Sequence, residues 1–89
     1  MILPASTVQK LTNANPGRGY FAVQNMDSDL AKLVYLLPYE AEPEVFVNQG
    51  FALGGYGVFE IQNCITPVSK RAWHAYTTET NISVRVVDL

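Results

Sequence analysis

The chain has 89 residues and a net charge of −2, with 48% hydrophobic residues and only 16% charged ones. This length leaves room for one domain over residues 1–89, whose core hides about 60 to 65% of the surface of the unfolded chain. The six Lys and Arg residues are scattered and form no basic stripe, so we expect no nucleic-acid partner. Apolar side chains that so small a core cannot hide are expected to face another protein.

The start of the chain lacks the features of a secretory signal. Residues 1–4 are followed by neither a basic nor a long apolar segment, and no apolar run approaches the roughly 18 residues of a membrane span. We therefore expect a soluble protein that is made without a signal peptide and has no membrane partner. Cys64 is the only cysteine, so no disulfide can form within the chain, and a reducing compartment fits.

The first turn signal along the chain is Asn15-Pro16-Gly17-Arg18. Proline presets φ at the second position of a turn, and glycine accepts the positive φ that a type II turn needs at the third. We predict such a turn here, joining a first strand near residues 7–12 to a second at residues 19–25. The polar residues 25–29 predict the next turn.

Residues 29–37 fit two structures. The spacing of their apolar residues predicts a short helix behind the possible N-caps Asp27 and Ser28. Residues 33–37 also form an apolar run of the length typical of a buried strand. Pro38 ends either element, so the two alternatives stay open. The apolar residues with helical spacing are Leu30, Leu33, Val34 and Leu37.

The middle of the chain alternates turn signals with short apolar runs. Residues 40–44 are acidic and include Pro43, which predicts an exposed loop. A short strand is predicted at residues 45–47, and residues 51–53 are expected to continue the sheet. The glycines that bracket Tyr56 predict a turn between residue 54 and residue 57.

Three further segments show strand patterns. Residues 58–62 alternate, which places Phe59 and Ile61 on one face of a half-buried strand. After a loop at residues 63–70, residues 72–77 form a second alternating run, and a final strand is predicted at residues 82–86. The sequence therefore predicts an all-β fold: a small antiparallel β-sandwich of six to eight strands.

Residues that could support catalysis or metal binding are sparse. Cys64 and His74 are the only thiol and imidazole, and no orienting acid or known local motif accompanies them. Asp27 and Asp29 lack the spacing of an EF-hand, and the glutamates of residues 40–44 are typical of a solvated loop. We therefore expect a protein that is not an enzyme and that uses no cofactor and no metal.

Aromatic residues provide the stronger candidates for a contact surface. Their side chains combine a large apolar area with a polar tip, which suits either the stacking of a sugar or a protein contact. Trp73 has a simpler alternative, since it could fill the core of the sandwich. The candidates are Tyr35, Tyr39, Tyr56, Trp73 and Tyr76.

Taken together, the strand and turn motifs resemble those of small β-sandwich virion proteins of tailed bacteriophages. The likeness runs from about residue 13 to residue 87 and is weakest over residues 30–49. The motifs that carry it are Asn15-Pro16-Gly17-Arg18-Gly19-Tyr20-Phe21-Ala22-Val23-Gln24-Asn25, Val58-Phe59-Glu60-Ile61, Pro67-Val68-Ser69, Trp73-His74-Ala75 and Ile82-Ser83-Val84-Arg85-Val86-Val87.

This resemblance implies a jelly-roll-like fold, often a homotrimer, that decorates or cements the capsid or belongs to a head fibre or tail part. The implied partners are other copies of the chain and the major capsid protein or other virion proteins, and the implied location is the virion after synthesis in the host cytoplasm. Arg18 would form an interface ion pair or brace the backbone, and Tyr20 would be a contact aromatic. Tyr56, Trp73 and Tyr76 complete the expected interface residues.

A different class of function stays open beside this one. The chain could be a glycan-binding or receptor-binding module of a phage tail or fibre. In that case exposed aromatic residues such as Tyr56 and Trp73 would form the stacking platform.

Overall fold

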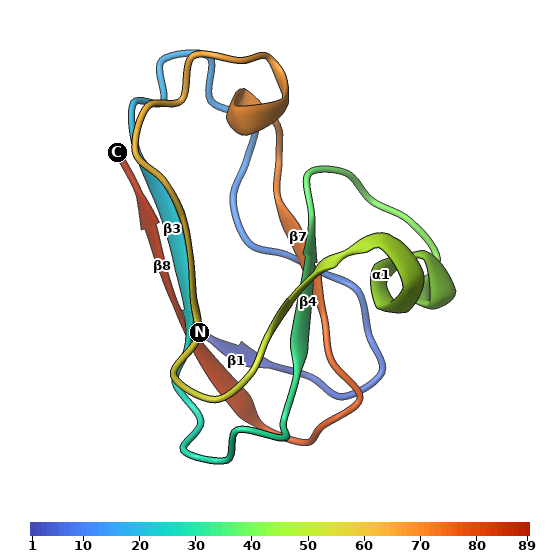
Figure 1. The fold of residues 1–89 in the computed structure, drawn as a ribbon. Coiled ribbons are helices and arrows are strands. Elements are labelled where there is room, and N and C mark those ends of the chain that lie inside the picture. Colours follow the sequence, from blue (N-terminus) through green and yellow to red (C-terminus); the bar gives the residue numbers. More distant parts are fainter.

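Eight strands, one short α-helix and one 3₁₀ turn are present in the computed structural model, which describes all residues from 1 to 89. The strands form two antiparallel four-stranded sheets that pack face to face, so the predicted β-sandwich is confirmed (Figure 1). In chain order the elements are β1 (Ile2–Leu3), β2 (Gln9–Lys10), β3 (Phe21–Asn25), β4 (Val34–Leu37), α1 (Pro43–Gln49), β5 (Phe51–Leu53), β6 (Val58–Ile61), the 3₁₀ turn η1 (Val68–Lys70), β7 (His74–Tyr76) and β8 (Ile82–Asp88).

The order of the strands defines a jelly roll. The first sheet has the order β1-β8-β3-β6 and the second has the order β2-β7-β4-β5. The first strand pairs with the eighth, the second with the seventh, the third with the sixth and the fourth with the fifth. The chain is thus one long antiparallel ribbon wrapped around itself. The additional pairs β3–β8 and β4–β7 join the parts of this ribbon into the two four-stranded sheets.

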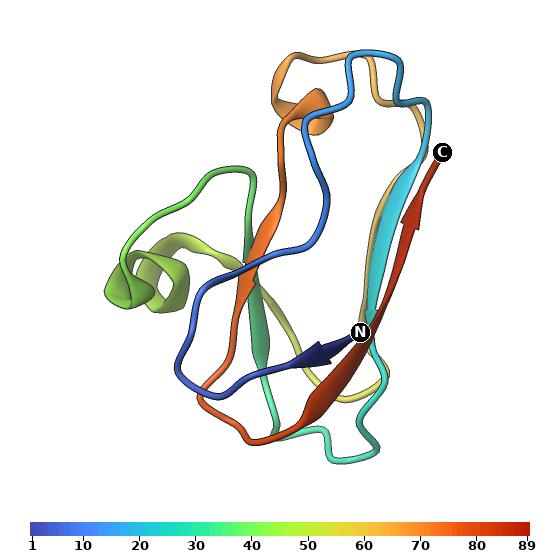
Figure 2. The same ribbon diagram turned by 180° about the vertical axis from the view of Figure 1, so that it is seen from behind.

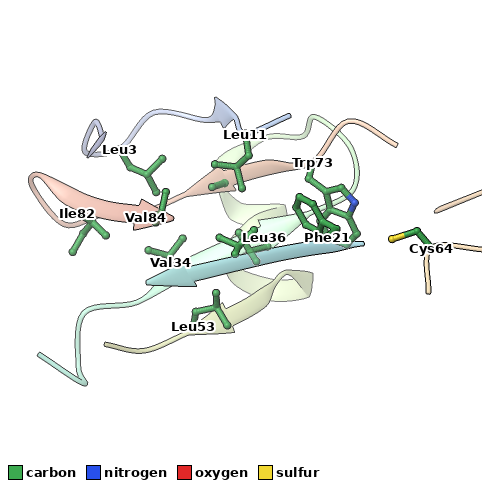
Figure 3. Packing of buried hydrophobic residues seen from close by; sticks show 12 residues of the cluster. Leu3, Leu11, Phe21, Val34, Leu36, Leu53, Cys64, Trp73, Ile82 and Val84 are labelled. Carbon is green, nitrogen blue, oxygen red and sulfur yellow. The ribbon is translucent and has the colours of Figure 1, made fainter. Parts of the chain in front are cut away.

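The core lies between the sheets and follows from alternation along the strands. In β3, Phe21 and Val23 point inward, and both are fully buried. Trp73, which directly precedes β7, is 1% exposed and stacks on Phe21 with 5.2 Å between the ring centroids (Figure 3). Aliphatic side chains from β4, β5 and β8 fill the rest of the space: Val34, Leu36, Leu53, Ile82 and Val84.

The helix α1 corrects the prediction for residues 40–47. The expected strand at residues 45–47 is wrong, and residues 43 and 44 belong to the helix and not to an exposed loop. Pro43 occupies the first turn, where its fixed φ and missing N–H suit a helix start. Phe46 is fully buried against Leu37 and Tyr76 on the outer face of the second sheet, which α1 covers (Figure 1). This tertiary contact outweighs the preference of β-branched residues for strands.

The two alternatives for residues 29–37 are resolved in favour of a strand. The possible short helix is wrong, because residues 34–37 form β4, a central strand that pairs with both β5 and β7. Val34 and Leu36 point into the core and are fully buried. Leu30, which the helix would have used in its apolar face, is 73% exposed.

The N-terminal third also differs in detail from the prediction. Only Gln9 and Lys10 of residues 7–12 are paired as a strand, and β1 was not expected because two residues show no alternation. The turn at residues 15–18 is present, since the N–H of Arg18 donates to the carbonyl of Asn15. It is not type II, because no glycine has positive φ, and the Asn15 side chain instead accepts a hydrogen bond from the Gly17 N–H.

Candidate functional site

Arg18 is the most completely bound polar side chain of the molecule. It lies at the end of the sandwich where the β2–β3 loop, the β6–β7 loop and the C-terminal end of β8 meet (Figure 2). Its Nε donates to Oδ1 of Asp88 at 2.7 Å, and its Nη2 donates to Oδ2 of the same carboxylate at 3.1 Å. Its Nη1 donates to the carbonyls of Ser69 at 2.8 Å and Arg71 at 2.9 Å.

The remaining contacts of Arg18 complete its burial. Nη2 also donates to Oγ1 of Thr12 and to the carbonyl of Asn13, both at 3.0 Å. The guanidinium carbon lies 5.0 Å from the centroid of the Phe21 ring. The side chain is fully buried, so in this fold Arg18 braces the backbone of its own chain and cannot form the interface ion pair that was considered for it.

Asp88 is the partner that makes this buried cation tolerable. Its side chain is 26% exposed and also accepts a hydrogen bond from Nδ2 of Asn15 at 3.4 Å. The hydrogen bonds from Arg18 are the main cause that lowers the pKa of the Asp88 carboxyl below its ordinary value. The pair joins residues 70 positions apart in the sequence, which explains why no sequence pattern pointed to Asp88.

Tyr20 forms a separate pair on the outer face of the first sheet. Its hydroxyl donates to Oε2 of Glu60 at 2.5 Å, and Nε2 of Gln62 donates to the other carboxylate oxygen at 3.0 Å. The hydrogen bond between Tyr20 and Glu60 raises the pKa of the tyrosine and lowers that of the glutamate. Tyr20 is half-buried and its partner is exposed, so both remain accessible to another molecule.

Tyr56 lies at the tip of the turn between β5 and β6. Its side chain is 58% exposed, and its φ of 60° places the backbone in the left-handed region. That conformation costs a non-glycine residue about 1 to 2 kcal/mol. The turn is closed by a hydrogen bond of 2.8 Å from the Gly57 N–H to the Gly54 carbonyl. A strained backbone that presents an aromatic ring to solvent is typical of a binding residue.

The same turn packs closely against the β3–β4 loop. A Cβ atom on Gly55 would lie 2.5 Å from the carbonyl oxygen of Asp29 and 2.6 Å from that of Asp27. Only glycine fits this approach, so the loop holds the turn, and therefore Tyr56, in a fixed position.

Trp73 and Tyr76 do not belong to the surface. Trp73 is 1% exposed in the core, and Tyr76 is 8% exposed under α1, where it packs on Phe46. Their expected interface role is therefore corrected, because neither ring can reach a partner while the subunit keeps this fold. Trp73 instead fills the core of the sandwich, which was the other prediction for this residue.

An aromatic row reaches the surface between β5 and β6, and it ends in Phe51, which sequence patterns did not single out. The ring centroid of Phe59 lies 5.2 Å from that of Trp73, and the centroid of Phe51 lies 4.8 Å from that of Phe59. Phe51 is 50% exposed, although it points toward the core side of its sheet. β5 and β6 are the edge strands of their sheets, so the row ends at an open side of the sandwich, where Phe51 and Val58 are exposed.

The residues weighed for chemistry have separate partners. The Sγ of Cys64 lies 3.7 Å from the carbonyl of Ile61, and Nδ1 of His74 lies 3.1 Å from the carbonyl of Ala72. The surface has no detectable pocket, and no three His, Cys, Asp or Glu side chains gather as metal ligands. None of the helices has the length and apolar character needed to cross a membrane.

Comparisons with protein families, with curated proteins and with solved structures give no match for this chain.

Proposed function

We propose that this chain is a structural protein of a tailed-phage virion, a capsid decoration or cement subunit that stabilises the particle through protein contacts. The resemblance of its strand and turn motifs to small virion sandwiches supports this, and the jelly-roll order of its strands fits it. In this proposal the chain binds other copies of itself, as the homotrimer that the resemblance implies, and binds the major capsid protein. It acts in the virion after synthesis in the host cytoplasm.

One observation carries the proposal of a contact function: eleven large hydrophobic side chains are exposed. They do not result from a loose fold. The accessible surface is 4939 Å², close to the roughly 5,200 Å² expected for a compact monomer of this mass. The surface is thus normal in size for a folded monomer, and in this proposal a partner covers part of these exposed side chains.

The alternative of a glycan-binding module is less well supported. Its stacking platform needs Tyr56 and Trp73 side by side in solvent, and Trp73 is inside the core. Tyr56 alone offers one ring, and a single ring also suits a protein contact.

The test is direct localisation followed by reconstitution. Mass spectrometry of purified virions should find the chain in stoichiometric amounts, and particles that lack it should lose heat stability and regain it when the purified protein is added. Tyr56→Ser should weaken this binding at least tenfold, whereas Tyr39→Ser, which removes a tyrosine that is 39% exposed, serves as the matched control. Absence from virions, or particles of unchanged stability, would refute the proposal. Binding to cell-wall sugars instead would favour the alternative.

A further inference from the structure

The strand β6 has a free edge with unpaired main-chain groups. It is the last strand of the first sheet and pairs only with β3. The N–H of Asn25 donates to the carbonyl of Gly57, so the hydrogen-bonded positions on the β3 side are residues 57, 59 and 61. The N–H and C=O groups of Val58 and Glu60 therefore point away from the sheet.

The other edges are shorter or better protected. β1 and β2 have two residues each, and Pro4 directly follows β1. β5 has three residues and is followed by Gly54. β6 has four residues and contains no Pro, and its one charged residue, Glu60, is bound on the outer face by Tyr20 and Gln62. It is the longest edge strand of the molecule.

Apolar side chains flank this edge. Val58 is 55% exposed on the outer face, and Phe51 and Phe59 form the end of the aromatic row on the inner side. An aromatic side chain carries about 200 Å², so the exposed half of Phe51 offers about 100 Å². A standard interface buries about 800 Å² per partner, of which some 450 to 500 Å² is apolar. Phe51 thus supplies about a fifth of that apolar area, and the exposed half of Val58 adds to it.

We propose that β6 pairs antiparallel with β6 of a second copy of this chain about a two-fold axis. The pair joins the two first sheets into one continuous eight-stranded sheet. The same axis brings the β5 edges together, so Phe51 and Phe59 of both copies meet and are covered. The second copy fits this site because the edge and its apolar border are self-complementary under a two-fold rotation.

The register follows from side-chain orientation and charge. Residues directly opposite each other must point to the same face, so the two-fold axis passes through one residue of the strand, which lies opposite its own copy. An axis at Val58 would need Tyr56 opposite Glu60, and Tyr56 lies outside the strand. The next two positions for the axis are Phe59 and Glu60. The second arrangement places two carboxylates directly opposite, which is unfavourable. With Phe59 at the axis, Val58 of each copy lies opposite Glu60 of the other, and these residues exchange main-chain hydrogen bonds. A two-fold axis at Ile61 would place Glu60 of each copy opposite Gln62 of the other, and Gln62 lies beyond the strand.

This inference does not depend on the virion role. It expects a two-fold dimer of the free chain, and such a dimer would replace the homotrimer that the resemblance implies. The oligomer is measured by light scattering of the purified chain at tens of micromolar. A dimer is expected. Val58→Pro, which removes only an outward N–H, should weaken it about 10- to 100-fold through the loss of two hydrogen bonds. Ile2→Pro removes an outward N–H at the opposite edge of the same sheet, and this control should remain a dimer.

Cysteine pairing tests the register without damaging the core. Mixed Val58→Cys and Glu60→Cys chains should form an intermolecular disulfide, because opposite Cα atoms of such a pair are about 5.5 Å apart. Neither variant alone should crosslink efficiently. Crosslinking of Glu60→Cys alone, or of Val58→Cys alone, would show an axis at that residue and overturn the Phe59 register. A wild-type monomer, a dimer that Val58→Pro leaves intact, or a trimer without crosslinks would overturn the edge pairing, and the trimer would leave the proposed function standing.

Discussion

The Arg18–Asp88 pair gives the sharpest prediction about stability. Replacing Asp88 by Asn keeps the size of the side chain and removes its charge. The Arg18 side chain is fully buried and stays charged, because a guanidinium does not lose its proton in a protein. The substituted amide offers one acceptor where the carboxylate accepted at 2.7 and 3.1 Å. We therefore expect an incompletely compensated buried cation.

The size of the effect can be bounded from the contacts. Removing one partner of a buried ion pair costs about 3 to 5 kcal/mol. Arg18 keeps three carbonyls and the Thr12 hydroxyl as acceptors, and Asp88 is partly exposed, so the lower end applies. We predict that Asp88→Asn lowers the free energy of unfolding by about 2 to 3 kcal/mol. For a chain of this length that corresponds to a melting temperature about 10 to 20 °C lower.

Urea and thermal unfolding at pH 7, at one protein concentration, would measure this loss. Glu60→Gln is the matched control, because Glu60 also accepts a short side-chain hydrogen bond but lies on the exposed outer face. That control should leave the unfolding midpoint unchanged. A loss below about 0.5 kcal/mol for Asp88→Asn, within the range of ordinary surface substitutions, would refute the reasoning that the burial of Arg18 makes its partner essential.

The pair also predicts the direction of a pH effect. The pKa of Asp88 is lower in the folded chain than its ordinary value of 3.8. Its carboxylate therefore stabilises the fold above about pH 4, and this contribution is lost as the pH falls through the folded-state pKa. The difference between wild type and Asp88→Asn should shrink progressively below pH 3.8. An undiminished difference at the lowest pH at which both chains fold would contradict the assignment.

Three other substitutions test individual contacts. Tyr56→Gly relieves the left-handed backbone and should stabilise the isolated chain by about 0.5 to 1 kcal/mol in urea unfolding, even while it weakens partner binding. Gly55→Ala forces a Cβ against two carbonyl oxygens and should cost about 1 to 3 kcal/mol, measured as a lower melting temperature. Phe46→Ala empties the space between α1 and the second sheet and should cost about 3 kcal/mol, with faster hydrogen exchange over residues 43–49.

Sequence patterns predicted the strands that have one buried face and one exposed face, because such strands alternate apolar and polar residues. β6 and β8 have one face toward the core and another toward solvent, and the alternating residues of each strand show this directly. β3 is buried over nearly its whole length and was predicted as an apolar run between two turns. α1 could not be predicted in the same way, because its seven residues are too few for a helical period and include β-branched valines. It forms because Phe46 packs against Leu37, which is nearby in the sequence, and against Tyr76, which is distant in the sequence.

The surface was harder to predict than the core for the same reason. Tyr56 was selected as an aromatic residue, and the glycines that bracket it predict the turn that exposes it. Trp73 and Tyr76 were selected by residue type, and residue type does not reveal which face of β7 a helix will cover. Arg18 was noticed within a turn motif, but the carboxylate that fixes its role lies at the other end of the sequence.

One row of inward-facing residues crosses the second sheet, and the residues at its two ends indicate what covers the β5–β6 side. Across the second sheet, Gln9, Ala75, Leu36 and Phe51 lie in register from one edge to the other. The residue at the β2 edge is a half-buried glutamine, whose Nε2 donates to the Lys10 carbonyl in an exposed hydrogen bond. The residue at the β5 edge is a phenylalanine that leaves half of its ring in water. If both edges of the sheet stayed in solvent, a polar residue would suit the β5 end of the row as well as it suits the β2 end. The asymmetry is explained if the β5–β6 side loses its water to a second copy and the β2 side does not.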